Sequence, residues 1–337
     1  MRITRRDISV LIAMAGLRRA TSPFEVLSAF DSQDGWEKYP GNPVLGGQYG
    51  TCFDVCVLHE AGAYKMWVSW RPKQSIALTE SKDGIHWSPP EVVLGPDRGT
   101  GWEDDVNRPV VVHREDAYHM WYTGQANAGS VIGYATSRDG RTWAKQSAHP
   151  VLEPALPWEG LAVMCPHVMW DTKEKMWRLW YSAGEQYEPN AIGYATSADG
   201  FHWNKYAGNP VMTPERGAPW ESQRVTAAQI IQSKGWYYSF YIGFRDINHA
   251  QIGLAWSKDG ITNWCDTDAL IERGISVEGN PIVRPTPGGW DADACYKPYI
   301  VNASGRWMLW YNGRNGSFEQ IGLVTHTGSD LEFVPAG

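Results

Sequence analysis

IGYATSRDGRTW, residues 132–143, is the stretch of sequence that decides the fold. Its apolar beginning predicts a short strand, and Asp139-Gly140 supplies the two turn residues of a β-hairpin. Glycine tolerates positive φ in such a turn, and an aspartate side chain can bond back to the backbone. Trp143 then begins the next strand. The segment therefore predicts strand, tight turn and strand, without the apolar period of a helix.

The turn motif Ser-x-Asp-Gly-x-x-Trp recurs with a period of roughly 60 residues, which marks an internal repeat. Each repeat also has an apolar strand that ends in a Met-Trp-Tyr-like triplet, an Ile-Gly-Tyr-Ala-like strand and, after the turn, an Asn-Pro-Val-like strand. The motif begins at Ser81, Ser137, Ser197 and, with one extra residue, Ser257, and a shortened form begins at Ser32.

Five four-stranded units predict an all-β fold, a five-bladed β-propeller that spans residues 31–337. The last unit stops after its third strand and a degenerate turn near Ser329-Asp330, whereas Trp36 to Leu45 has the sequence of an outer strand without preceding strands. We therefore expect this N-terminal strand to complete and close the last blade. An open solenoid would need atypical capping units, and none is visible in the sequence.

Residues 1–30 are predicted to form a separate N-terminal arm. Arg5-Arg6 and the apolar run from Ile8 to Leu17 resemble a twin-arginine or Sec signal, but Arg18-Arg19 stand where a cleavage site needs small residues. The alternatives are a short amphipathic helix or a disordered arm, and a cytoplasmic location is favoured over export. No segment reaches the roughly 18 apolar residues that span a bilayer, so we expect no membrane span.

Composition argues against nucleic acid as the main partner. The formal net charge is -7 and the basic residues are scattered, whereas phosphate contacts need a concentrated basic face. The 19 Trp, 16 Tyr and 35 Gly suit short, closely packed strands joined by tight turns. The five cysteines have neither a disulfide framework nor zinc-ligand spacing, so we expect free thiols and no metal site.

One column of the aligned repeats varies in charge, as a column that faces a pocket should. Aligning the units on the Met-Trp-Tyr triplet puts an acid, two bases and two small residues at this position, beside a column that stays apolar. An acid within an apolar strand is costly to bury unless it is paired, so Asp54 is a site residue, a salt-bridge partner of Arg108 or Lys297, or both. The column contains Asp54, Arg108, Cys165, Ala227 and Lys297.

Further polar residues precede the innermost strands and are expected at the same entrance of the central channel. Asp104-Asp105 follows Glu103 directly and forms the densest acidic cluster. Crowded carboxylates raise one another's pKa, which keeps a general acid protonated near neutral pH; a solvated acidic loop is the alternative. The other residues specific to single units are Asn107, His167, Gln223, Arg224 and Asp293.

A tryptophan followed by an acid recurs just before the innermost strands. The repetition predicts a structural pair at the blade edge, and the indoles alternatively offer faces for sugar rings. The pairs are Trp102-Glu103, Trp158-Glu159, Trp220-Glu221 and Trp290-Asp291.

Together these elements resemble the five-bladed propeller glycoside hydrolases, the group that includes families 43, 32, 68 and 130, over about residues 32 to 333. The resemblance implies a first-blade aspartate as base or nucleophile, a second-blade aspartate that orients the substrate or tunes a pKa, and a third-blade glutamate as acid. Asp54 matches the first role. The acid is then Glu159 or Asp105, or catalysis has been lost. At the equivalent place the second unit reads Asn107-Arg108-Pro109 and the third unit reads Met164-Cys165-Pro166, so neither has the acid that the resemblance implies.

The predicted function is that of an enzyme, a glycosidase that cleaves an oligosaccharide or glycoside at the mouth of the channel, with Asp54 as base or nucleophile. No cofactor is expected; a structural channel metal such as calcium is the alternative, because His167 and carboxylates converge. Phosphorolysis, with Arg108, Arg224, Lys297 and His167 binding phosphate, and a non-catalytic carbohydrate-binding propeller are the rival hypotheses. The expected substrate-binding residues are Asp104, Asn107, Arg108, His167, Glu221, Arg224, Asp293, Lys297 and Trp102.

Overall fold

The computed structural model describes residues 36–126, 129–185, 189–214, 218–266, 280–303 and 305–327. The expected arm, residues 1–30, lies outside these ranges, as do the shortened turn at Ser32 and the degenerate turn at Ser329-Asp330. Within them the chain forms strands and four short 3-10 segments, and no α-helix. The predicted all-β fold is therefore confirmed. The 3-10 segments are η1 (Gly47–Tyr49), η2 (Arg71–Lys73), η3 (Arg98–Thr100) and η4 (Pro157–Glu159).

The strands pair antiparallel in sets of four, and each set is called after its innermost strand. The β2 set contains β2 (Cys52–Glu60), β3 (Ala63–Trp70), β4 (Ser75–Ser81) and β5 (Glu91–Leu94). The β6 set contains β6 (Asp105–Arg114), β7 (Ala117–Ala126), β8 (Gly129–Ser137) and β9 (Ala144–Lys145). The β10 set contains β10 (Ala162–Asp171), β11 (Met176–Gly184), β12 (Pro189–Ser197) and β13 (Asn204–Lys205). The β14 set contains β14 (Arg224–Ser233), β15 (Trp236–Asp246), β16 (His249–Ser257) and β17 (Cys265–Asp266). The β18 set contains β18 (Ala294–Ala303), β19 (Arg306–Asn315), β20 (Phe318–Thr327) and β1 (Trp36–Lys38).

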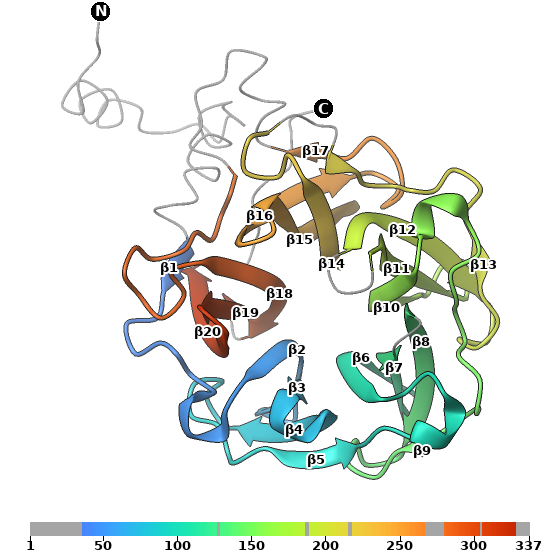
Figure 1. The fold of residues 1–337 in the computed structure, drawn as a ribbon, viewed down its shortest axis with the longest axis horizontal. Helices are drawn as coiled ribbons and strands as arrows, with labels where there is room; N and C mark the ends of the chain where they lie inside the picture. Colours follow the sequence, from blue (N-terminus) through green and yellow to red (C-terminus); the bar gives the residue numbers. More distant parts are fainter. Residues whose placement is uncertain are drawn as a thin grey trace, which may run out of the picture.

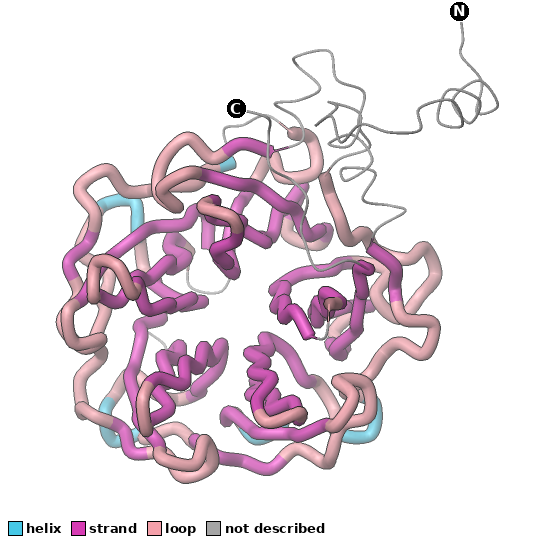
Figure 2. The backbone as a smooth tube through the Cα atoms, turned by 180° about the vertical axis from the view of Figure 1, so that it is seen from behind, coloured by secondary structure: helices cyan, strands magenta, loops and turns pink. Residues whose placement is uncertain are grey.

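The sets lie side by side around a common centre, as in a β-propeller (Figure 1). Strands β2, β6, β10, β14 and β18 are nearest to this centre, and Figure 2 shows the same arrangement from behind. Parallel bridges from Ala162 to Ser130 and from Ala250 to Ala294 join neighbouring sets. The innermost strands of all the sets therefore face one central region.

The first described strand pairs with the last one. Trp36 of β1 lies opposite His326 of β20, and Lys38 lies opposite Val324. The Nζ atom of Lys38 also donates a hydrogen bond of 2.5 Å to Asp291 Oδ2, just before β18. The two ends of the described chain thus share one sheet.

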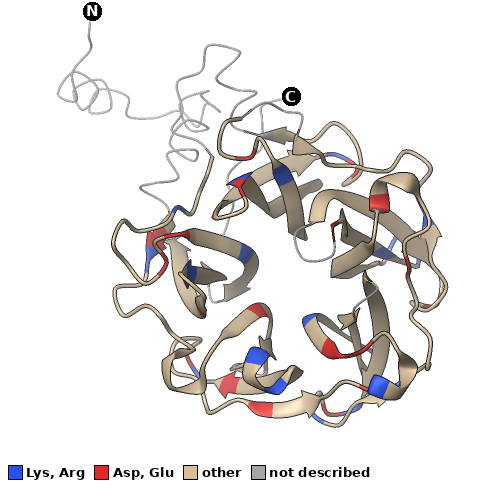
Figure 3. Cartoon of the chain, viewed as in Figure 1, with Lys and Arg blue, Asp and Glu red and all other residues tan. Residues whose placement is uncertain are grey.

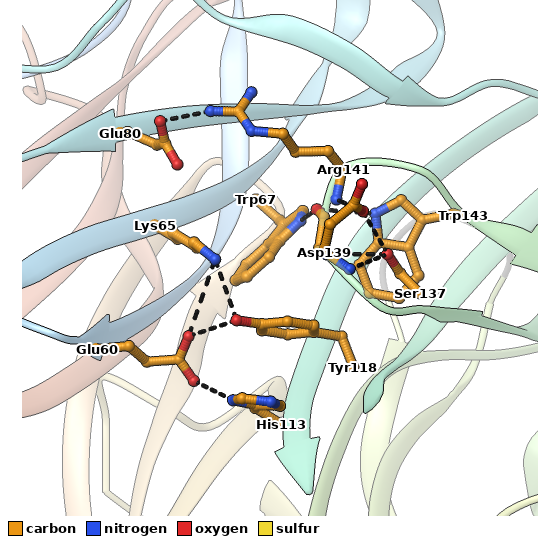
Figure 4. A network of polar contacts seen from close by, with 11 residues as sticks. Glu60, Lys65, Trp67, Glu80, His113, Tyr118, Ser137, Asp139, Arg141 and Trp143 are labelled. Carbon is orange, nitrogen blue, oxygen red and sulfur yellow. Dashed lines mark hydrogen bonds and ion pairs between the residues drawn. The ribbon is translucent and has the colours of Figure 1, made fainter. Parts of the chain in front are cut away.

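Tryptophans of the second strands join neighbouring sets. The Nε1 atom of Trp67 on β3 donates to the carbonyl oxygen of Gly140 at 2.9 Å, in the Asp-Gly turn of the next set (Figure 4). A buried N–H group without an acceptor lowers stability, so the indole of Trp67 requires the turn of the next set beside it. On β15 the equivalent residue is Phe240, which cannot donate. The same bond joins Trp121 to Gly200 at 2.8 Å, Trp180 to Gly260 at 2.8 Å and Trp310 to Gly84 at 3.0 Å.

Hydrogen bonds made by the recurring Ser, Asp and Gly of the repeat motif fix the turn that accepts this bond. Gly140 N–H donates to Ser137 Oγ at 2.9 Å, and Ser137 Oγ donates to Asp139 Oδ1 at 2.8 Å. Asp139 Oδ1 accepts from the backbone N–H groups of Thr142 and Arg141 at 2.7 and 2.8 Å. These bonds hold the pKa of Asp139 well below its usual range. The Asp-Gly turn predicted from the sequence therefore presents its carbonyl in a fixed direction.

A second contact joins the β2 and β6 sets away from the turn. Glu60 at the end of β2 accepts a hydrogen bond of 2.7 Å from the hydroxyl of Tyr118, and His113 Nδ1 lies 2.6 Å from its other oxygen (Figure 4). The rings of His113 and Tyr118 stack with centroids 4.0 Å apart. Polar and aromatic contacts therefore add to the tryptophan link between these two sets.

The core lies within and between the sets, and large aromatic side chains fill it. All five cysteines are free, as expected, and only Cys265 is more than slightly exposed. No helix in the described ranges has the length and apolar character that crossing a membrane requires. The largest fully buried side chains are Trp67, Trp121, Trp180, Trp256, Trp310, Tyr122, Tyr181, Tyr238, Tyr241, Tyr311 and Phe240.

Replacing Trp180 with phenylalanine should lower the free energy of unfolding by at least about 1 kcal/mol, because the carbonyl of Gly260 loses its buried donor. Denaturant unfolding followed by tryptophan fluorescence and circular dichroism measures the change. The control is Trp236→Phe at the start of β15, a half-buried indole outside this link. The tryptophan link would be unimportant if both variants lost the same stability.

Candidate active site

A cavity of about 410 Å³ lies where the innermost strands meet, and every set contributes to its wall. The variable column of the aligned repeats lies here, because all five of its residues line the cavity. Figure 3 shows charged segments on β2, β6 and β18 near the centre of the ring. The column residues are Asp54 on β2, Arg108 on β6, Cys165 on β10, Ala227 on β14 and Lys297 on β18.

Each column residue sits at a bulge with left-handed backbone. The φ angles are 52°, 52°, 51°, 48° and 50° in chain order, a region that non-glycine residues rarely adopt. On β2 the pairing with β3 skips between Phe53 and Cys56, and the other four innermost strands skip at the same place. A bulge redirects the side chain of the extra residue. The strained backbone thus turns one side chain per set toward the cavity.

Side chains of the preceding set hold this backbone in place. Asp54 N–H donates to Asn312 Oδ1 at 2.9 Å, and three further column residues donate to a hydroxyl at the equivalent position. Lys297 is the exception, because Ile242 occupies that position on β15 and has no acceptor. The hydroxyl acceptors are Ser69 for Arg108 (2.8 Å), Thr123 for Cys165 (3.1 Å) and Ser182 for Ala227 (2.7 Å).

Asp54 is a buried carboxylate with one oxygen held and one oxygen near a guanidinium. Only 3% of the surface of Asp54 is exposed. Oδ1 accepts a hydrogen bond of 2.8 Å from Asn312 Nδ2, and Oδ2 lies 3.3 Å from Arg108 Nε without a hydrogen bond in the described structure. The ion pair with Arg108 that the sequence offered as an alternative is therefore present, and Asp54 nevertheless lines the cavity.

A chain of polar contacts connects Asp54 with Asp105. Arg108 Nη1 donates to Asn107 Oδ1 at 2.7 Å, and Asn107 Nδ2 donates to Asp105 Oδ1 at 2.7 Å. Asp105 is half-buried and Asp104 is exposed, and both line the cavity. The predicted acidic cluster of the second unit thus reaches the same cavity as the first-unit aspartate.

A second charged pair in the cavity wall, Arg71 and Glu319, was not predicted from the sequence. Arg71 Nη2 lies 2.9 Å from Glu319 Oε2, and the hydroxyl of Tyr296 donates to the other oxygen of Glu319. Burial raises the pKa of Tyr296, and the negative charges of Glu319 and Asp54 raise it further. Arg71 directly follows β3 and Glu319 is the second residue of β20, so both lie near the point where a second strand connects to a third. Charged residues in those connections are the signal that could have identified them.

The structure does not bring Glu159 to the cavity. Glu159 is fully buried in η4 and accepts four hydrogen bonds, of which one comes from Tyr181 Oη at 2.7 Å and one from Lys205 Nζ at 2.6 Å. The backbone N–H groups of Ala155 and Leu156 donate the other two, at 2.6 and 2.8 Å. Burial by itself raises the pKa of Glu159, but these donors bring it below its ordinary value. Glu159 is therefore held by donors of its own set and does not line the cavity.

Two of the other recurring acids, Glu103 and Asp291, have the same kind of environment, which favours the structural interpretation of the tryptophan–acid pair. Glu103 accepts from Tyr122 Oη at 2.6 Å and from Lys145, and Asp291 accepts from Tyr311 Oη at 2.9 Å and from Lys38 at 2.5 Å. Glu221 is buried at the equivalent place.

Six of the residues expected to bind substrate lie outside the cavity wall, namely Trp102, Asn107, His167, Glu221, Arg224 and Asp293. His167 Nε2 bonds to the carbonyl oxygen of Ile230 in the neighbouring set at 2.8 Å, and burial together with the charge of Lys297 lowers its pKa to about 3. Asp293 accepts from the backbone N–H of Gly316 at 2.7 Å. Trp102 donates to the carbonyl oxygen of Ala148 at 3.0 Å, and Arg224 Nη1 donates to Asn190 Oδ1 at 2.9 Å.

No three His, Cys, Asp or Glu side chains gather as a metal site would need within the part of the chain that the structure describes. His167, whose convergence with carboxylates suggested a channel metal, bonds to Ile230 instead.

Comparison with known proteins identifies relatives of this chain. Residues 56–226, just over half of the sequence, match the family model described as the glycosyl hydrolases family 32 N-terminal domain. The uncharacterized protein Rv1502 of Mycobacterium tuberculosis (strain ATCC 25618 / H37Rv) is 27% identical over 250 residues, which cover 70% of this chain and 76% of that protein.

Solved structures share the fold at low sequence identity. One belongs to the GH130 family, described as mannoside phosphorylases that include glycoside hydrolases targeting beta-1,2 mannosidic linkages in Candida mannan; its TM-score is 0.68 at 18% identity, over 88% of this chain and 94% of that chain. A thermostable family-43 glycoside hydrolase has a TM-score of 0.65 at 18% identity, over 84% of this chain and 91% of that chain. The resemblance to propeller glycoside hydrolases is therefore confirmed.

Replacing Glu159 with glutamine should destabilise the protein by about 2 kcal/mol at neutral pH, because a charged acceptor of four hydrogen bonds becomes a neutral amide. The folded-state pKa of Glu159 lies below its ordinary value of 4.5. Its contribution is therefore present above that pH and is lost as the pH falls through the lower folded-state value. Urea unfolding at neutral and acidic pH measures both effects.

Glu174→Gln is the matched control, since Glu174 is exposed in the hairpin between β10 and β11. This control should stay within roughly 0.5 kcal/mol of the wild type at every pH. Equal stability of the two variants at neutral pH would contradict the structural role of Glu159.

Proposed function

The chain belongs to the glycosyl hydrolases family 32 N-terminal domain family, a family of glycosidases, and we propose that it cleaves a glycosidic bond in the cavity where its innermost strands meet. The observation that carries the proposal is the position of Asp54. This carboxylate lies on a strained bulge in the cavity wall, with one oxygen fixed by Asn312 and the other without a hydrogen bond among the described residues.

Asp54 has the properties of a base or nucleophile. The amide of Asn312 fixes the direction of the carboxylate, and the guanidinium of Arg108 balances its charge. Oδ2 is then the oxygen that can accept a proton from water or attack the anomeric carbon. Both steps need a carboxylate that is positioned before the sugar arrives, because positioning supplies much of the catalytic effect.

Asp105 is our candidate for the general acid. It lines the same cavity, it is half-buried, and the described contacts engage only one of its oxygens, through Asn107. Arg108 and Asn107 connect it to Asp54, so the two carboxyl groups are held by one polar chain. Glu159 is not a candidate for the acid, because it lies outside the cavity wall and four donors bind its carboxylate.

We further propose that the five sets are the blades of one closed propeller, residues 31–337, with β1 as the outer strand of the last blade. The Trp36-Glu37-Lys38 sequence supports this, because its lysine reaches the acid of its own set as Lys145 and Lys205 do in theirs. A closed ring would keep the cavity residues of the first and last blades together.

Phosphorolysis is the second candidate, and the basic side chains of the cavity wall favour it. Phosphate would replace water as the nucleophile, and the product would be a sugar phosphate. A requirement for inorganic phosphate in the assay distinguishes the two reactions. The basic residues of the wall are Arg71, Arg108, Lys297 and Arg314.

Asp54→Asn should lower kcat/KM by at least about 10³-fold in a screen of aryl glycosides and oligosaccharides, since the base or nucleophile is lost. The melting temperature should stay close to that of the wild type. Asp116→Asn, in the exposed hairpin between β6 and β7, is the control for the same chemical change and should keep full activity. Turnover that survives in Asp54→Asn would overturn the site assignment, and sugar binding without any turnover would favour a binding propeller.

Asp105→Asn should discriminate between leaving groups. For oligosaccharides, whose leaving alcohol needs a proton, kcat should fall by about 10²- to 10⁴-fold. For a dinitrophenyl glycoside, whose leaving phenolate needs no proton, the rate of bond cleavage should remain near the wild-type rate. Steady-state kinetics on both substrates test the role, and equal losses on both would exclude Asp105 as the acid.

A further inference from the structure

Lys297 is a buried cation in the wall of the cavity. Its residue is only 5% exposed, and its backbone bulge directs it to the same space as Asp54 and Arg108. The adjoining wall, from the β14 set, is mostly apolar, with Ala227, Ile242 and Phe244 beside the hydroxyl of Thr226. An ammonium group with so little exposed surface is poorly solvated unless an anion or hydrogen-bond acceptor lies beside it.

No such partner is present among the residues that the structure describes. Among the described residues no carboxylate lies within 4.0 Å of Lys297 Nζ, and none forms a hydrogen bond with this atom. The other basic residues of the wall differ in this respect. Arg108 lies beside Asp54 at 3.3 Å, Arg71 beside Glu319 at 2.9 Å, and Arg314 Nη2 donates to the carbonyl oxygen of Asn248 at 2.7 Å.

Two buried groups that feel the charge of Lys297 are neutral at pH 7. Burial and the charge of Lys297 lower the pKa of His167 to about 3, so its ring carries no charge. Burial raises the pKa of the Cys56 thiol to about 11, even though Lys297 acts in the opposite direction. Neither group supplies a negative charge, so an anion bound in the cavity is the partner that would balance Lys297.

We propose that the sugar bound in this cavity carries a carboxylate, and that Lys297 binds it; the assignment of the cavity as the sugar site rests on the proposed function. Lys297 presents a single positive charge, and the described residues offer it neither a carboxylate nor a hydrogen-bond acceptor. Of the arginines, which suit bidentate phosphate binding, Arg108 and Arg71 are engaged by Asp54 and Glu319 and Arg314 by a carbonyl oxygen, and the carboxylates of the same wall would repel a dianionic phosphate more strongly than a monoanion. A uronic acid satisfies Lys297 with a single charge and leaves the existing ion pairs intact.

Matched pairs of monosaccharides test this inference without any turnover. Glucuronate with glucose, galacturonate with galactose, and mannuronate with mannose differ at carbon 6 only. Titration calorimetry on the wild-type protein should find at least one acid that binds at least tenfold more tightly than its neutral partner. Lys297→Met should remove this preference without weakening the binding of the neutral sugar, and Lys297→Arg should retain it.

Lys175→Met is the control variant. Lys175 is exposed in the hairpin between β10 and β11 and has a φ angle of 52°, close to that of Lys297, so the change in residue type and backbone is the same. This variant should keep the full preference for the acid. Lys297→Met should also raise the melting temperature in the absence of sugar, because a desolvated charge is removed; a lysine with a structural role would lower it.

Three results would overturn the inference: no preference for any acid at tens of millimolar sugar, a preference that survives Lys297→Met, or inorganic phosphate as the anion whose binding depends on Lys297. A Lys297→Met protein that fails to fold would contradict it as well. The proposed function fails separately, if Asp54→Asn keeps its turnover. An acid preference that depends on Lys297 would stand even then.

Discussion

The bond from a buried tryptophan to the carbonyl of the next Asp-Gly turn is the interaction on which the rest of the structure depends. Trp67 reaches Gly140 in the following set, and Trp310 of the last set reaches Gly84 of the first. A buried indole N–H cannot be left unsatisfied without loss of stability. Four of the five junctions between sets therefore depend on this bond, whereas Phe240 takes the place of the tryptophan between the β14 and β18 sets.

This rigid arrangement explains how the innermost strands carry chemistry. Every set has the same bulge with left-handed backbone, and in four cases a side chain of the preceding set holds the N–H group of the bulged residue. Such a conformation persists only where the surroundings impose it. Because the scaffold is repeated and the bulged side chain is not, an acid at Asp54, a guanidinium at Arg108 and an ammonium at Lys297 meet in one cavity.

The carboxylates of this protein fall into two groups, according to how many hydrogen-bond donors surround each of them. Glu159 accepts four hydrogen bonds and stabilises its own set. Asp54 accepts one hydrogen bond from Asn312 and keeps an oxygen beside Arg108 in the cavity wall. A carboxylate held by four donors outside the cavity meets no substrate, whereas a carboxylate in the cavity wall with one oxygen that accepts no hydrogen bond can exchange a proton with one. The same residue type thus serves the fold in one place and is suited to glycosidase chemistry in the other.

The sequence by itself determined the all-β fold, the Asp-Gly turns and the column from Asp54 to Lys297, because a regular repeat puts equivalent residues at equivalent places in the sheet. Tertiary structure alone decided which charges share the cavity. Arg71 and Glu319 are 248 residues apart in the chain and meet through connections that follow no period. It also decided that Glu159 is enclosed by donors and that Lys297 faces the cavity without a described partner. Contacts of this kind depend on how separate strands pack together, so the sequence can mark such residues as charged but does not say which of them meet.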